Sequence, residues 1–465
     1  MNMINVRRLT VMTFLGAGML SGISAQVSPL QVDTLKETKI PDQWDLQSCI
    51  DYAKEQNITI RKNRITAAST QIDVKTAKAA LFPSLSFSTS QQVVNRPYQE
   101  TSSRVSGSEI ISSNSKTSYN GNYGLNASWT LYNGNKRLKT IQQEKLNNQM
   151  AELDVATSEN NIQESIAQVY IQILYAAESV KVNENTLQVS IAQRDRGQEL
   201  LNAGSIAKSD LAQLEAQVST DRYQLVTAQA TLEDYKLQLK QLLELDGENE
   251  MNIYLPALSD ENVLAPLPTK RDVYISALSL RPEIEASKLN VEASELGINI
   301  AKSSYFPTIS LSAGIGTNHT SGSDFTFGEQ VKNGWNNSIG LSVSVPIFNN
   351  RQTKSAVQKA KLQYETSMLS LLDEQKALYK TIESLWLDAN SAQQRYAAAN
   401  EKLKSTQISY ELISEQFNLG MKNTVELLTE KNNLLQAQQE QLQAKYMAIL
   451  NTQLLKFYQG DQLAL

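Results

Sequence analysis

The stretch AKAALFPSLSFS at residues 77–88 returns as AKSSYFPTISLS at residues 301–312, so the Phe-Pro dipeptide at Phe82 recurs 224 residues later at Phe306. In both copies alternating apolar and hydroxyl residues follow the dipeptide. Proline disfavours the α conformation in the residue before it. Each copy therefore predicts a helix that ends just before a strand.

Two further matches extend this duplication along the chain. GLNASW begins at Gly124 and GLSVSV begins at Gly340, and NAG at residues 202–204 corresponds to NLG at residues 418–420, both 216 residues apart. The spacing thus shortens by 8 residues between the two strand-like segments, where the first copy has the longer insertion. Insertions are best tolerated in surface loops, so we expect a loop at that place.

Each copy predicts the order helix, strand, loop, strand, long helix, tight turn, long helix. One continuous first helix is expected at about residues 45–81, with its counterpart at 271–306. The polar segments 95–118 and 319–332 are expected to be loops on one outer side. The expected strands lie at about residues 84–96, 119–132, 308–318 and 336–348.

The helices after the strands are unusually long. Residues 135–196 contain no glycine or proline, which allows roughly 90 Å of helix, and residues 347–419 are equally free of both. Helices of this length indicate coiled-coil, membrane or repeat packing. The return helices carry a seven-residue stripe: Leu211, Val218, Leu225, Leu232 and Leu239, then more weakly Leu427, Leu434, Ala448 and Leu455, interrupted at Gln441. Such a stripe is typical of an a/d heptad seam, although any antiparallel helical hairpin could carry one.

The strands place apolar residues on one face and small polar residues on the other, which suits either a half-buried sheet or a lipid-facing barrel with a wet lumen. Four strands cannot close a membrane barrel, because the smallest have eight and an open edge in lipid leaves backbone groups unpaired. Three copies are the smallest ring that leaves a lumen. The predicted fold class is mainly α with membrane β: a long α-helical coiled-coil barrel plus four strands per chain in a transmembrane β-barrel completed by trimerisation, with internal duplication.

Composition argues against several classes of protein. The net charge of -5 shows no nucleic-acid footprint. One cysteine and one histidine, Cys49 and His319, make a zinc site of the usual type unexpected. We expect Cys49 to be a buried small apolar residue. With His319 in an outer loop no catalytic triad can be assembled, and no phosphate-binding loop occurs. We therefore expect no enzyme, no cofactor and no metal.

The chain begins with an apparent export signal. Arg7 and Arg8 precede a short apolar run at residues 11–23, and Ser24 and Ala25 supply small residues for cleavage. We expect the chain to divide into a signal peptide (1–25), a first repeat (26–246), a linker or equatorial segment (247–269) and a second repeat (270–465). The stretch 26–43 is expected to be polar and extended.

The ordered, duplicated set of segments resembles the TolC-type outer-membrane efflux factor family over nearly the whole mature chain. The resemblance rests on the two Phe-Pro strand entries, on the paired tips at residues 202–211 and 418–427, and on Trp44-Asp45-Leu46-Gln47 at the start of the first helix. It implies a homotrimer with a twelve-stranded barrel in outer-membrane lipid and helices in the periplasm. It also implies a periplasmic adaptor and an inner-membrane RND or ABC pump as partners, for efflux or type I secretion.

The same resemblance assigns roles at the two helix tips. Acidic positions that constrict the periplasmic entrance match Asp210 and Glu426, and a further acidic position falls on Thr429, with Glu430 next to it. Lys422 matches a basic position that helps to hold the closed state, and Phe417 an aromatic one. Ordinary solvated charges near a helix start are the alternative interpretation. The tip turns expected to dock the adaptor comprise Gly204, Ser205, Lys208, Gly420 and Met421.

Two other classes remain open. An exported coiled-coil structural protein or adhesin would explain the heptads and the signal but would not require strand pairs once per repeat. A periplasmic adaptor also carries a helical hairpin, usually one without this full duplication. The exported substrate is left undetermined, since selection is expected at the pump.

Overall fold

The structure is a computed structural model that describes residues 41–98, 116–246, 251–256, 263–323 and 325–463, with the backbone of 102–106 and 109–113. The expected signal peptide and most of the extended stretch 26–43 lie outside the described residues, as do parts of the linker 247–269. Residues Asp42–Leu465 form one compact unit.

The expectation of one continuous first helix is wrong in both copies. The chain forms two helices in each: α2 (Leu46–Gln56) and α3 (Ile58–Ala79), then α6 (Lys270–Leu280) and α7 (Pro282–Ser303). In the first copy Asn57 interrupts the helix, because its side chain accepts hydrogen bonds from the backbone N–H groups of Thr59 and Ile60. In the second, Pro282 occupies the first helical position, where its missing N–H is tolerated.

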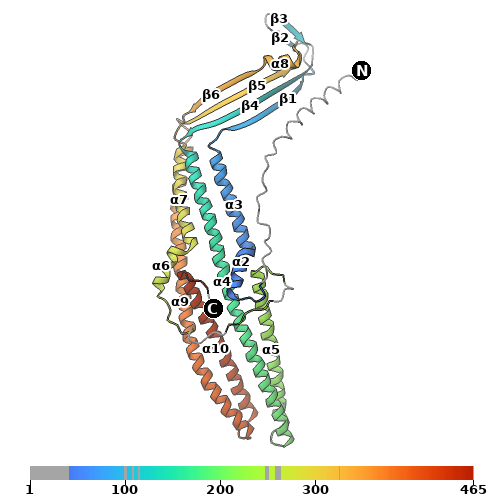
Figure 1. Cartoon of the computed structure of the whole chain (residues 1–465), viewed down its shortest axis with the longest axis vertical. Helices are drawn as coiled ribbons and strands as arrows, with labels where there is room; N and C mark the ends of the chain where they lie inside the picture. Colours follow the sequence, from blue (N-terminus) through green and yellow to red (C-terminus); the bar gives the residue numbers. More distant parts are fainter. Residues whose placement is uncertain are drawn as a thin grey trace, which may run out of the picture. The chain divides into compact units, whose positions relative to one another are not determined.

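Four antiparallel strands form one sheet in the order β1-β4-β5-β6 (Figure 1). The strands are β1 (Ser84–Asn95), β4 (Thr117–Asn133), β5 (Thr308–Thr320) and β6 (Asn336–Ser344). The β4–β5 pairing joins the two repeats into one sheet. β6 ends at Ser344, short of the expected residue 348, and Pro346 follows two residues later without an N–H for the ladder.

Both segments that were expected to be loops contain regular structure. Within 95–118 lies a two-stranded hairpin of β2 (Ser102–Ser106) and β3 (Glu109–Ser113). Within 319–332, β5 continues to Thr320 and helix α8 (Phe327–Asn333) begins with a capping box between Thr326 and Glu329. His319 therefore lies in a strand, and its ring is buried, so its expected place in an outer loop is wrong.

The duplication extends to helix length. Helices α4 (Lys136–Asn202) and α9 (Gln352–Asn418) have 67 residues each, and the return helices α5 (Lys208–Leu242) and α10 (Thr424–Gln459) have 35 and 36. Within the unit, the sheet lies at one end of these helices and the turns α4–α5 and α9–α10 lie at the other (Figure 1). Among the described residues, no helix meets the length and apolarity needed to cross a membrane.

Most of the predicted heptad positions form the packing seam, while Leu225 and Leu232 of α5 are only half-buried. Leu211, Val218 and Leu239 are buried on α5, and Leu427, Leu434, Ala448 and Leu455 are buried on α10. Cys49 is fully buried as expected, in a core cluster that also contains Trp44, Tyr170 and Tyr396. This cluster brings α2, α4, α5, α9 and α10 together midway along the helices, so the free ends of both hairpins extend beyond it.

Candidate functional site: the helix tips and a buried charged cluster

The two tip turns have the same backbone geometry. In the first, the Ser205 N–H donates to the Leu200 carbonyl (2.8 Å) and the Gly204 N–H to the Leu201 carbonyl (2.9 Å). In the second, Met421 and Gly420 donate to Gln416 and Phe417 at 2.8 and 2.9 Å. These bonds define a Schellman motif, which needs a left-handed residue at its centre. Gly204 and Gly420 supply it with φ of 75° and 73°.

Both predicted entrance acids lie at the third position of a return helix. The Asp210 Oδ2 atom accepts a hydrogen bond from the Ala207 N–H at 3.0 Å. The Glu426 Oε2 atom accepts from the Asn423 N–H at 3.2 Å, while Asn423 Oδ1 accepts from the Glu426 N–H at 2.9 Å. A carboxylate at the third helical position accepts a hydrogen bond from a backbone N–H that has no partner within the helix. Its negative charge is also stabilised by the positive end of the helix dipole. Capping is therefore one established role of both acids.

Lys422 and Glu426 form an ion pair within the second tip. The Lys422 ammonium donates to Glu426 Oε1 at 2.6 Å, and both side chains remain partly exposed. This bond, followed by the Asn423 backbone bond, lowers the pKa of Glu426 below its ordinary value. The carboxylate consequently stays ionised at more acidic pH than a free glutamate, and the pair is lost only as pH falls through that lowered pKa.

The other predicted tip residues take no part in this ion pair. Phe417 is buried, whereas Ser205, Lys208 and Met421 are exposed on the two tip turns. The Thr429 hydroxyl donates to the Val425 carbonyl (2.8 Å), and Glu430 accepts from Ser409 of α9 at 3.1 Å. Among the described residues, no hydrogen bond or ion pair joins Asp210 to Glu426. A ring of these acids would require other copies of the chain.

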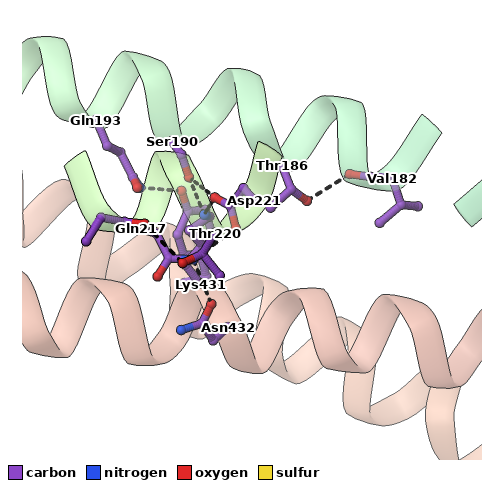
Figure 2. Close-up of polar contacts among 11 residues, drawn as sticks. Val182, Thr186, Ser190, Gln193, Gln217, Thr220, Asp221, Lys431 and Asn432 are labelled. Carbon is purple, nitrogen blue, oxygen red and sulfur yellow. Dashed lines mark hydrogen bonds and ion pairs between the residues drawn. The ribbon is translucent and has the colours of Figure 1, made fainter. Parts of the chain in front are cut away.

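A buried charged cluster, for which no sequence motif was recognised, joins the two hairpins a few helical turns from the tips. It consists of Ser190 on α4, Asp221 on α5 and Lys431 on α10. Figure 2 shows the Lys431 ammonium directed at the Asp221 carboxylate and the Ser190 hydroxyl, and it donates to both. The Lys431 and Asp221 side chains are only 3% and 1% exposed. This ion pair is therefore almost fully shielded from water, unlike the Lys422–Glu426 pair.

Neutral polar groups complete the cluster. The Gln217 amide donates to the second Asp221 oxygen at 2.9 Å and to Asn432 Oδ1 at 3.4 Å (Figure 2). Burial lowers the pKa of Lys431, and the Asp221 carboxylate opposes that shift by accepting a hydrogen bond from the ammonium. The sequence did hold a signal. Leu214, Asp221 and Ala228 follow one another at seven-residue intervals, beside the stripe that begins at Leu211, and the second stripe of a heptad seam is normally apolar. Its partner lies 210 residues away, so pattern alone could not find it.

Comparison with known proteins agrees with this architecture. The model of the family described as outer membrane efflux protein matches residues 49–244 and 273–460, most of the chain in two parts. The chain belongs to the outer membrane efflux protein family. Members of this family are non-enzymatic proteins of the outer membrane, and that is where this chain is located.

The curated relatives of this chain share about a quarter of its residues or fewer over the matched segments. The outer membrane efflux protein BepC of Brucella suis is 24% identical over 294 residues, covering 63% of this chain and 61% of BepC. Outer membrane protein TolC of Escherichia coli is also 24% identical, covering 61% of this chain and 58% of TolC. The chain thus spans about three fifths of these relatives. The toxin and drug export protein A of Aggregatibacter actinomycetemcomitans is 22% identical over 89% of this chain and 87% of its own length.

Solved structures share the fold of this chain over about nine tenths of its length. CusC matches with a TM-score of 0.75 and 19% identity, covering 90% of this chain and 92% of CusC. VceC of Vibrio cholerae matches with a TM-score of 0.72 and 16% identity, covering 90% and 97%. The predicted fold class, mainly helical with a small set of strands and an internal duplication, is confirmed.

Proposed function

We propose that the chain is one subunit of a trimeric outer-membrane channel, a passive duct through which an efflux pump or type I secretion system exports its substrates. In this proposal the repeats 26–246 and 270–465, joined by 247–269, each supply two strands to a barrel of twelve. A periplasmic adaptor docks on the exposed tip turns, and an inner-membrane RND or ABC pump drives transport. Substrate selection belongs to the pump.

The four-stranded sheet carries this proposal. One of its faces is apolar and exposed: Leu85, Phe87, Leu125, Trp129, Ile315, Ile339, Leu341 and Val343 all leave 39% or more of their surface uncovered. Its outer strands β1 and β6 each pair on one side only. Such edges are very costly in lipid, because unpaired backbone groups find no water there. Pairing β6 of one copy with β1 of the next removes every edge when the ring closes.

The experiment that tests the channel combines fractionation, mass and conductance. We expect the protein in the outer-membrane fraction, soluble only in detergent, with the mass of three chains, and we expect it to conduct ions in planar bilayers. A monomer that is soluble without detergent and does not conduct would exclude the channel. It would favour the exported coiled-coil protein instead.

We further propose that Asp210 and Glu426 narrow the entrance. Three copies of each would bring like charges together, and a bound cation would relieve their repulsion. We expect Asp210→Asn with Glu426→Gln to raise single-channel conductance severalfold and to weaken block by divalent cations. The amides retain an oxygen that can accept the capping bonds at Ala207 and Asn423, so this pair of substitutions removes charge with little effect on the helix starts.

Two comparisons make the test of the entrance specific. Glu233→Gln with Glu401→Gln removes two exposed, ion-paired acids far from the tips and should leave conductance unchanged. Asp210→Ala with Glu426→Ala removes the caps as well and should match the amide variant in conductance. Conductance and divalent block that stay at wild-type levels in the amide variant would contradict a role of these acids in the entrance.

A further inference from the structure

Helix α8 packs on the apolar face of the sheet. Residues of β5 with odd numbers share this face, and the register places Ile315 opposite Leu125 and Leu311 opposite Leu341. Thr317 and His319 continue the same alternation toward the end of β5. The Thr317 hydroxyl donates to the Val331 carbonyl of α8 at 2.7 Å, and the His319 ring meets the Phe327 ring edge-on at 5.0 Å. The helix therefore covers the face that is apolar nearer the start of β5.

The sheet provides a packing surface for α8, centred on the ring of His319. The ring of His319 stacks on Tyr123 (5.9 Å between centroids) and lies 5.3 Å from the ring of Tyr119. Gly121, opposite His319 on β4, leaves the space, since a Cβ there would stand 2.2 Å from His319 Cε1. The Thr320 N–H also donates to the Gln330 side chain of α8 at 2.9 Å. These contacts hold α8 over the part of β5 that lies about 7 to 17 Å beyond Ile315.

Aromatic side chains of α8 and its flanks keep much of their surface exposed, although Phe327 also contacts the His319 ring. Phe325, Phe327 and Trp335 are 53%, 45% and 58% exposed, and Glu329 and Lys332 add charge beside them. Aromatic side chains next to polar ones, at the border of an apolar band, are typical of the membrane–water interface. A short amphipathic helix lying in that plane buries its apolar side among headgroups.

We propose that α8, with Phe325, Phe327 and Trp335, is an interfacial anchor that rests on the headgroup region of the outer leaflet. Because α8 lies on the same face of the sheet as the apolar residues that would contact lipid, we take lipid to be what covers its exposed aromatic side chains. The inference rests on the proposed channel, because it requires the sheet to span the membrane. It adds a surface outside the barrel wall that fixes how deeply each subunit sits.

Tryptophan fluorescence tests this anchor in vesicles of phosphatidylcholine and phosphatidylglycerol. The chain has four tryptophans, of which Trp129 lies on the apolar face and Trp335 follows α8. Trp129→Phe leaves Trp335 as the reporter of α8, and Trp335→Phe leaves Trp129 as the reporter of insertion. A variant lacking both gives the signal of Trp44 and Trp386 for subtraction.

We expect Trp335 to lose most of its emission with lipids brominated near the headgroup, and little with aqueous iodide. Trp129, which lies on the apolar face of the sheet, should respond to brominated lipids. Trp129 quenched by lipid with Trp335 quenched by iodide would overturn the anchor and leave the channel standing. Trp335 shielded from both quenchers would also overturn it, since a neighbouring subunit would then cover α8. Failure of Trp129 to respond to any brominated lipid would overturn the channel itself.

Discussion

Replacement of Lys431 by methionine is expected to lower the free energy of unfolding by about 3–5 kcal/mol, because it leaves the Asp221 carboxylate buried without its counter-ion. Gln217 and Ser190 would still donate to Asp221, but neutral donors replace an ammonium poorly in a site closed to water. Urea titration of the purified protein in detergent, followed by helical circular dichroism, measures the change.

The chain offers a matched control for this substitution. Lys402 of α9 also bridges to an acid on a neighbouring helix, Glu440 of α10 at 2.7 Å, but both side chains are more than two fifths exposed. Lys402→Met should cost only about 0–1 kcal/mol. The double variant Lys431→Met with Asp221→Leu should regain most of the loss, since a buried pair is often replaced by apolar residues without penalty. An effect of Lys431→Met no larger than that of Lys402→Met would refute the burial argument.

The second large effect is expected at Arg281, where helices far apart in sequence meet. Its guanidinium donates to Glu164 of α4 at 2.6 Å and lies 3.6 Å from the ring centroid of Tyr458 on α10. The Arg281 side chain is 6% exposed, while Glu164 keeps some contact with water. We expect Arg281→Met to cost about 3 kcal/mol, at the lower end for a broken buried pair because Glu164 is partly solvated.

Arg281→Lys separates charge from shape. Lysine keeps the positive charge but lacks the planar group that stacks on Tyr458 while it bonds to Glu164. We therefore expect the free energy of unfolding of Arg281→Lys to lie between those of the wild type and Arg281→Met. Arg64, whose exposed pair with Glu159 spans 2.8 Å between α3 and α4, supplies the comparison: Arg64→Met should change stability by less than about 1 kcal/mol. Equal losses for Arg281→Met and Arg64→Met would show that the Arg281 contact is not a buried one. The same urea titration reads all three.

Local pattern predicted much of this architecture. Proline and glycine mark where helices stop, and their absence over residues 135–196 predicts a single helix because nothing in that run prevents one. The break at Asn57 escaped prediction because asparagine is compatible with a helix interior. Its side chain caps α3 only in a context where its amide also reaches the Leu242 carbonyl of α5, at 3.0 Å.

The residues of the candidate site also differ in how far the sequence predicted them. Gly204 and Gly420 were predictable, since a helix that reverses needs a left-handed residue and glycine tolerates it. Asp210 and Glu426 were identified by resemblance, and their capping bonds follow from their place three residues after the caps. The Lys422–Glu426 pair is local as well, four residues apart on one turn. The role of these residues in an entrance remains a proposal.

The sequence by itself determined the duplication, because matching segments can be aligned directly. It also determined the extent of the long helices, the strand alternation and the tip turns, because each of these depends on residues within a few positions of one another. The tertiary structure alone decided that Lys431 neutralises Asp221, that Arg281 meets Glu164 and Tyr458, and that α8 lies on the apolar face of the sheet. These contacts join residues from 14 to 210 positions apart, and whether a charge is paired or a ring is covered depends on how whole helices pack.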